Sequence, residues 1–263
     1  MFYLDEQLHT CFNLRQPLFD QLMNLKGETF RSLEGRTTQR VKLNGKNYFI
    51  KQHRGVGFRE IIKNLLQLRL PVISAKNELL AIKKLHQLGI HVPAVAGFGE
   101  RGKNPASRES FILMEELAPV TSLEMLCANW KKSPPSFAYK HYLLQQAAHI
   151  ARTLHENGIN HRDFYICHLL LEQLPGVDVE HAKLFLIDLH RAQIRAQIPL
   201  RWRIKDLAGL YFSSLDAGLT LRDLLRFMKY YRKMPLRDIL RSEHQLWKKV
   251  KNRGDDLYRD HAK

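Results

Sequence analysis

Alternation of apolar and polar residues marks the N-terminal part of the chain as β-structure. The stretches with the composition of strands are residues 28–33, 37–43, 46–51, 93–99 and 110–115. Asn44-Gly45 separates the second stretch from the third, and this dipeptide is the strongest short signal for a hairpin turn. We therefore expect a small, mostly antiparallel sheet within residues 1–116.

A different spacing, with apolar residues three and four positions apart, predicts helices. The helical stretches are a short one within residues 1–26, then residues 58–70, 76–88, 137–157, 207–215, 221–232 and 236–250. The stretch 58–70 has basic residues on its polar face, so it either packs on the protein's own core or lies on a membrane surface. Residues 117–263 are thus predicted to be mainly helical, and the chain to belong to the α+β class.

Length and composition limit the class of protein further. With 263 residues, of which 44% are apolar, the chain can form one large domain or two lobes. It has no run of about 18 apolar residues, so we expect no transmembrane segment. The N-terminus lacks the order of a secretory signal, and the three cysteines stand far apart without metal-site spacing. These features predict a cytoplasmic protein without a structural zinc site.

The net charge of +16 is the strongest compositional signal. Such an excess repels itself, so it usually serves an anionic partner: nucleic acid, a phosphorylated glycan or the inner leaflet of a membrane. Residues 219–253 contain 11 Lys and Arg against 3 Asp and Glu, half of the total excess. A solvated helix face would give the same pattern. No nucleic-acid-binding module is recognisable, which favours the glycan or the membrane surface.

Candidate chemistry centres on the tripeptide His161-Arg162-Asp163. Together with the polar residue His168 and the apolar run that follows it, the tripeptide has the layout of a phosphotransferase catalytic loop. Asp163 is the candidate base for the acceptor hydroxyl. Arg162 cannot act as a base, so we expect it to hold the loop or a neighbouring anion. His161 is expected to be structural and to donate to a backbone carbonyl.

A second acidic residue, Asp188, follows Asp163 at the sequence spacing expected of a kinase. Asp188 ends a buried apolar strand that starts at Lys183, where kinases place the aspartate that binds Mg²⁺. His168 stands where kinases usually have a metal-binding asparagine, and its role stays open between a phosphate contact, a contact with Asp188 and a structural one. Asp206 is either the residue that braces the catalytic loop or an ordinary acid in the first turn of its helix.

The N-terminal part supplies candidates for binding the nucleotide. Lys51 ends the third predicted strand and is assigned to the donor phosphates, with Glu78 as its ion-pair partner. An acid early in a helix would also suit the helix dipole. Gly35 permits a tight turn near phosphate oxygens, although no Gly-x-Gly-x-x-Gly loop is present. Backbone groups around Glu115 are candidates for an adenine contact at a hinge over residues 114–119.

The segment after Asp188 argues against a protein kinase. It has no Ala-Pro-Glu anchor for a peptide platform. Instead it is rich in arginine, which suits an acceptor that already carries phosphates or carboxylates. Its arginines are Arg191, Arg195, Arg201 and Arg203.

Three stretches together resemble one known family. Residues 161–171, 48–57 and 97–102 are similar to the WaaP (RfaP) family of bacterial kinases that phosphorylate heptose in the lipopolysaccharide inner core. The resemblance implies a two-lobed, protein-kinase-like fold with ATP and Mg²⁺ in the cleft. It also implies transfer of the γ-phosphate to the first heptose of a lipid A-linked acceptor, at the cytoplasmic face of the inner membrane. The family likeness includes a histidine at position 168.

Two alternatives remain open at this point. No single residue identifies the sugar, so the acceptor could be the second heptose or Kdo. A non-catalytic, kinase-like scaffold that binds anionic lipid or nucleic acid would also be basic.

Overall fold

The computed structural model of the protein describes residues 1–33, 35–55, 57, 74–176 and 182–261. The chain divides into two compact units: residues 1–83 with 93–117, and residues 84–92 with 118–263. The helix predicted over residues 58–70 lies outside the described residues. The assignment of nucleotide binding to the first unit and of catalysis to the second stays a prediction.

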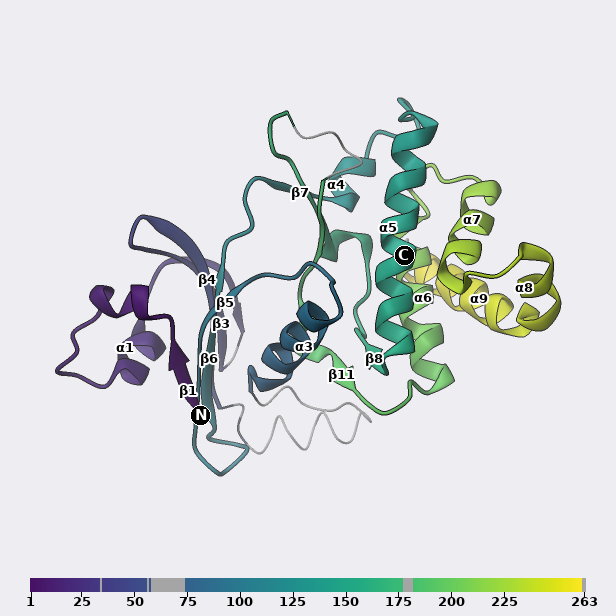
Figure 1. Ribbon diagram of the computed structural model, residues 1–263. Coiled ribbons are helices and arrows are strands. Elements are labelled where there is room, and N and C mark those ends of the chain that lie inside the picture. Colours follow the sequence, from purple (N-terminus) through teal and green to yellow (C-terminus); the bar gives the residue numbers. More distant parts are fainter. Residues whose placement is uncertain (34, 56, 58–73, 177–181, 262–263) are drawn as a thin grey trace. The chain divides into compact units, whose positions relative to one another are not determined.

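The first unit contains a six-stranded antiparallel sheet (Figure 1) with the strand order β1-β5-β6-β4-β3-β2. Its strands are β1 (Phe2–Leu4), β2 (Glu28–Leu33), β3 (Arg36–Leu43), β4 (Lys46–Arg54), β5 (Val95–Arg101) and β6 (Glu109–Glu115). Each predicted strand is present, with ends that differ by at most a few residues. The hairpin turn at Asn44-Gly45 has the expected left-handed φ values, 46° and 77°. β1 was not predicted, because three residues are too few to show an alternation.

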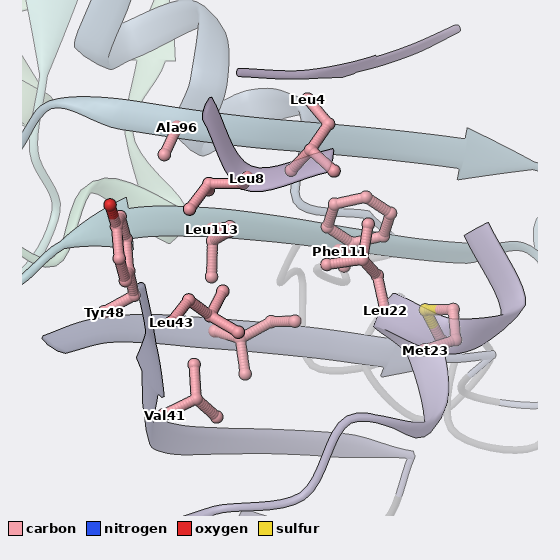
Figure 2. Packing of buried hydrophobic residues seen from close by; sticks show 11 residues of the cluster. Leu4, Leu8, Leu22, Met23, Val41, Leu43, Tyr48, Ala96, Phe111 and Leu113 are labelled. Carbon is pink, nitrogen blue, oxygen red and sulfur yellow. The ribbon is translucent and has the colours of Figure 1, made fainter. Parts of the chain in front are cut away.

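One face of this sheet carries a hydrophobic cluster of buried residues. The N-terminal segment crosses it with the 3₁₀-helix η1 (Glu6–Cys11) and the helix α1 (Leu18–Asn24), as Figure 2 shows. Leu8 and Leu22 of these helices are 2% and 0% exposed against the strands. Burial of each such side chain contributes roughly 1.5–3 kcal/mol. The buried amide of Gln52 in β4 donates to the backbone oxygens of Leu22 and Leu25 at 2.8 and 3.0 Å, which fixes the end of α1 to the sheet.

The helix α3 (Lys76–Gln87) follows its prediction closely. It ends in a left-handed glycine, Gly89, with φ of 76°, and the N–H of Ile90 returns to the carbonyl of Leu85. This hydrogen-bond pattern is a common way to close a helix C-terminus. Glu78 lies in the first turn of α3, as expected.

The second unit is mainly helical, with three short strand pairings (Figure 1). Its helices are α4 (Leu123–Cys127), α5 (Phe137–Glu156), α6 (Leu200–Ser214), α7 (Leu221–Arg232), α8 (Leu236–Ser242) and α9 (His244–His261). Its strands are β7 (Val120–Ser122), β8 (Ile159–Asn160), β9 (Leu169–Glu172), β10 (Leu184–Leu186) and β11 (Gln193–Ile194). α5 packs on α7 and α6 on α9. None of the helices in the described ranges is both long and apolar enough to span a bilayer.

Several expectations for the C-terminal part were wrong. α6 begins at Leu200, directly after Pro199, and not at residue 207, because the charged residues of its first turns hide the helical spacing. The stretch predicted as one helix over residues 236–250 is divided into α8 and α9. Within α7 the apolar Leu221 is 71% exposed, whereas Tyr231 of the basic C-terminal end is 2% exposed.

The start of α7 is held by a buried carboxylate. Asp223 forms a capping box with Thr220, and one of its oxygens lies 2.7 Å from the ammonium of Lys140 on α5. Burial by itself raises the pKa of Asp223, but the hydrogen bonds from Lys140 and Thr220 outweigh it and lower the pKa to about 2. The carboxylate therefore stabilises the fold in its charged form.

The pKa of Asp223 predicts a dependence of stability on pH. A carboxyl group with a lowered folded-state pKa stabilises the protein above its unfolded pKa and loses this effect as the pH falls through the folded value. We expect Asp223→Asn to lower the free energy of unfolding by about 2 kcal/mol near pH 7. The difference should shrink between about pH 4 and about pH 2. Urea unfolding across this range measures it, and a difference independent of pH would contradict the assignment.

Candidate functional site

The backbone of the predicted catalytic loop is held by one buried carboxylate. Asp206 of α6 is 0% exposed. Its two oxygens accept the backbone N–H groups of His161 at 2.7 Å and of Arg162 at 2.8 Å. Arg162 has a φ of 77°, a conformation that costs a non-glycine residue about 1–3 kcal/mol, so the loop needs this support. Asp206 lies in the second turn of α6, which rules out the first-turn alternative and supports its role as a brace.

His161 connects the loop to the segment that carries the second acid. The imidazole is fully buried, and its Nε2 donates to the backbone oxygen of Ile187 at 2.9 Å, as expected for a structural histidine. Burial lowers the pKa of His161, so the ring is neutral at physiological pH. Because Ile187 directly precedes Asp188, this bond fixes the two halves of the site relative to each other.

Asp163 presents its carboxylate next to a cation that the sequence did not pair with it. The guanidinium of Arg191 lies 2.9 and 3.0 Å from the two oxygens of Asp163, through the same Nη1 atom. The carboxylate is 16% exposed and the guanidinium 29%, so both groups remain accessible. Arg191 was expected only as one of several arginines near the acceptor. Nothing in the spacing distinguishes it from its neighbours Arg195 and Arg201.

Further cations gather around Asp163 and the ring of Trp202. The guanidinium of Arg162 lies 5.0 Å from the centre of this ring and the ammonium of Lys205 lies 5.6 Å from it. Burial lowers the pKa of Lys205, and the charge of Asp163 opposes this effect. Arg191 and Arg162 lower the same pKa further by repulsion. One carboxylate thus stands among more positive charge than it neutralises, which favours binding of a second anion.

Asp188 lies two residues after β10 in a left-handed conformation, with a φ of 61°. Its Oδ1 accepts a hydrogen bond from Nδ1 of His190 at 2.6 Å. On the other side, Nε2 of His168 lies 3.6 Å from Oδ2. Nδ1 of His168 lies 2.7 Å from the backbone oxygen of Asp163, and since a carbonyl only accepts, Nδ1 carries the hydrogen. His168 therefore bridges the backbone of one acid and the side chain of the other.

These residues fit Mg²⁺ in the way that nucleotide enzymes hold it. In the described part of the chain, no three side chains of His, Cys, Asp or Glu are arranged to hold a metal. Mg²⁺ needs no such cage, because it keeps several waters and takes one or two carboxylates together with substrate phosphates. Asp188 offers such a carboxylate, and its side chain is 24% exposed. The role of His168 in binding a phosphate stays a prediction.

The candidates for nucleotide binding in the first unit form one ion pair and two backbone features. The ammonium of Lys51 lies 2.6 Å from Oε1 of Glu78, whose side chain is 2% exposed. Gly35 has a φ of 73°, and its carbonyl accepts the N–H of Arg54 at 2.8 Å. The N–H of Glu115 donates to the carbonyl of Ala94 at 2.9 Å, so this N–H already has an acceptor.

The second unit also contains an apolar cavity that sequence analysis missed. Its volume is about 550 Å³. The cavity lies among α5, α6, α7, α8 and α9, and its lining includes Ala147, Leu210, Leu224, Leu225, Leu240 and Trp247. The apolar spacing of residues 137–157 and 221–232 predicted helices with one apolar face. It could not show that the helices leave a space between them.

A loop braced by an α6 carboxylate, an acid on that loop and an acid after the following strand pair define a kinase-like phosphotransferase. The sequence pattern of the Lipopolysaccharide kinase (Kdo/WaaP) family matches residues 20–231, and the chain belongs to this family. The predicted resemblance and the kinase-like fold are both confirmed.

Close relatives cover nearly the whole chain. A Lipopolysaccharide core heptose(I) kinase WaaP of Escherichia coli strain K12 is 51% identical, over 94% of this chain and 92% of the relative. A Lipopolysaccharide core heptose(I) kinase WaaP of Pseudomonas aeruginosa is 46% identical, over 97% of this chain and 95% of the relative. A solved structure, described as WaaP in complex with acyl carrier protein, matches with a TM-score of 0.84 and 40% identity, over 98% of this chain and 99% of that one.

The brace by Asp206 predicts a large effect of its removal. Asp206→Ala leaves two buried N–H groups without an acceptor, each worth about 1–3 kcal/mol, so we expect a loss of about 3 kcal/mol in the free energy of unfolding. Asp216→Ala is the control, because that carboxylate is 66% exposed in its pair with Lys131 and should cost less than about 1 kcal/mol. Urea unfolding compares the two variants. Equal losses would contradict the brace.

Proposed function

We propose that this protein is an ATP-dependent kinase that phosphorylates heptose(I) of the lipopolysaccharide core. The observation that carries the proposal is the braced loop, which presents Asp163 beside a cluster of cations in a chain of the Lipopolysaccharide kinase family. The identity of 46% and 51% to heptose(I) kinases over nearly their full length favours this sugar over Kdo or a second heptose.

Asp163 is proposed to orient the heptose hydroxyl and to accept its proton. The hydroxyl oxygen forms a bond to the γ-phosphorus as the bond to the leaving oxygen of ADP breaks, and the proton goes to a carboxylate oxygen of Asp163. The transition state is loose, so the proton moves late and positioning contributes more than basicity. Arg191 occupies both carboxylate oxygens in the absence of substrate. We propose that it then holds the Asp163 carboxylate in the correct orientation.

Lys51 is proposed to bind the donor phosphates, and Glu78 to hold its ammonium in place. Gly35 would allow backbone N–H groups near the phosphates, and backbone groups around Glu115 would meet the adenine edge. Asp188 would hold Mg²⁺, which neutralises phosphate charge during transfer. Nε2 of His168 stands beside Asp188, and it would donate to a phosphate oxygen when the ring carries a hydrogen on both nitrogens.

The acceptor is proposed to be the lipid A-core glycolipid, which carries anionic sugars and phosphates. The cations around Trp202 would bind an anionic group of this acceptor close to Asp163. The C-terminal helices add exposed basic side chains: Arg222, Lys229, Lys233, Arg237, Arg241, Lys248, Lys249, Lys251 and Arg253. Such a surface suits peripheral attachment to the anionic cytoplasmic face of the inner membrane, where each cation contributes about 1 kcal/mol.

Replacement of Asp163 tests the assignment of the base. Asp163→Asn keeps the shape of the side chain but cannot accept the proton, so kcat should fall by about a hundredfold or more with little change in ATP affinity. The measurement is phosphate transfer from ATP to purified heptosylated core acceptor, with the phosphorylated sugar located by mass spectrometry. Asp238→Asn, on the exposed side of α8, is the control and should behave as the unchanged enzyme.

Two results would count against this proposal. Full turnover by the Asp163→Asn variant would remove Asp163 from the chemistry. Phosphate on Kdo or on the second heptose would move the activity to another sugar while leaving the kinase assignment intact.

We further propose that an acyl chain fills the apolar cavity and that an acyl carrier protein delivers it. The cavity of about 550 Å³ is lined almost entirely by apolar side chains, and carbon chains are the ligands that such a space accepts. The solved structure with a TM-score of 0.84 is a complex of WaaP with acyl carrier protein. A bound chain would restore the packing that the cavity lacks and so stabilise the second unit.

The effects of acyl-chain length and of cavity volume on the melting temperature test the proposed acyl carrier protein partner. Acylated carrier protein should raise the melting temperature of the kinase, more for longer chains, since each buried methylene adds about 0.8 kcal/mol. The carrier without an acyl group is the control and should give a small shift or none. Ala147→Phe, which narrows the cavity from α5, should abolish the chain-length dependence. The same shift with and without the acyl group would contradict the proposal.

A further inference from the structure

A buried chain of polar side chains leads from α7 to the brace of the catalytic loop. The hydroxyl of Tyr231 lies 2.8 Å from Nδ1 of His155 near the end of α5. Nε2 of His155 lies 3.5 Å from Oδ2 of Asp206, the oxygen that accepts the N–H of His161. Tyr231, His155 and Asp206 are 2%, 6% and 0% exposed, so no water replaces a lost member at little cost.

The hydrogen atoms in this chain have one consistent arrangement. Nε of Arg203 donates to the Tyr231 oxygen at 2.6 Å, and a guanidinium cannot accept. The Tyr231 hydroxyl hydrogen is then directed to Nδ1 of His155, which accepts it. Nε2 of His155 therefore carries a hydrogen on the side of the ring that lies 3.5 Å from Oδ2 of Asp206, a close polar contact that does not meet the geometry of a hydrogen bond.

The ring of Tyr231 has little freedom to move. It stacks on the ring of Phe227 with 6.1 Å between the ring centres, and it packs edge-on against Trp247 with 5.8 Å between the ring centres. Arg203 in turn pairs with Glu243, whose other contact is with Arg232 at 2.8 Å. The hydroxyl is thus held at a fixed point by packing and by ion pairs from α6, α7 and the start of α9.

We propose that Tyr231 is a positioning residue for phosphate transfer, acting through His155 and Asp206 on the backbone of His161 and Arg162. It lies outside the reacting groups and touches no substrate. Its hydroxyl fixes the tautomer and the orientation of His155, and the Nε2 side of this histidine lies against the Asp206 carboxylate, which receives two loop N–H groups. The inference rests on the proposed kinase activity for its kinetic test, and on the fold alone for its structural test.

The experiment compares Tyr231→Phe with Tyr142→Phe in the full-length chain. Tyr231→Phe removes only the hydroxyl and keeps the packed ring, so the variant should fold. We expect kcat to fall by about tenfold or more, because a slightly misplaced base slows phosphate transfer. KM for ATP should stay unchanged. Tyr142→Phe removes a hydroxyl that donates to the backbone oxygen of Ala182 at 2.7 Å, away from the loop, and should retain wild-type kcat.

A double-mutant cycle with His155→Leu tests whether the loss of kcat in Tyr231→Phe arises through His155. If Tyr231 acts through His155, the double variant should be no slower than His155→Leu alone. Fully additive losses would overturn the proposal, and so would an unchanged kcat in Tyr231→Phe.

Amide hydrogen exchange supplies a readout that does not depend on the acceptor. The N–H groups of His161 and Arg162 should exchange faster in Tyr231→Phe than in the wild type and in Tyr142→Phe. Unchanged exchange at these two amides would overturn the proposal. If the wild-type enzyme transfers no phosphate to heptose(I) acceptors, the proposed function fails, and the exchange rates alone then decide the role of Tyr231.

Discussion

The carboxylate of Asp206 is the interaction on which the catalytic loop depends. A buried charge of this kind is costly unless hydrogen bonds satisfy it, and here two backbone N–H groups do so. In return the carboxylate stabilises Arg162 in a left-handed conformation that the chain would otherwise avoid. The strained residue directly precedes Asp163. The position of the candidate base thus follows from a side chain 43 residues later in the sequence, since Asp206 follows Asp163 by that interval.

The excess of positive over negative charge around Asp163 is the second feature on which the site depends. Arg191 neutralises Asp163, yet Arg162 and Lys205 remain close by, and repulsion from Arg191 and Arg162 adds to burial in lowering the pKa of Lys205. Such a cluster is unfavourable in a resting protein and becomes favourable when an anion arrives. The exposed cations of the C-terminal helices fit the proposed attachment to an anionic membrane surface for the same reason.

The parts of the fold that depend on local patterns were predictable from the sequence. The strands β2–β6 and the helices α3 and α5 lie where their sequence patterns predicted them, although β5 and β6 are buried on both faces. α6 was placed too late because its first turns carry Arg201, Arg203 and Lys205, which resemble a loop. That error also misplaced Asp206 in its helix. Short strands such as β1 give too little pattern to recognise.

The candidate site was predictable only where a motif fixes the spacing. Asp163, Asp188 and the pair of Lys51 with Glu78 came from the order of residues along the chain. The bond from Arg191 to Asp163 could not be predicted, because several arginines lie nearby in the sequence. Only the path of the folded backbone determines which of them reaches Asp163. The cavity and the chain from Tyr231 to Asp206 depend on how helices far apart in the sequence pack together.

The central claim is that the braced loop places Asp163 at the acceptor while Asp188 holds the metal. A crystal structure with Mg²⁺, a non-hydrolysable ATP analogue and a heptosylated core acceptor tests it most directly. The account predicts a Mg²⁺–oxygen distance of about 2.1 Å to Asp188 and a heptose hydroxyl within about 3 Å of the Asp163 carboxylate. Metal bound without Asp188, or an acceptor hydroxyl out of reach of Asp163, would contradict it.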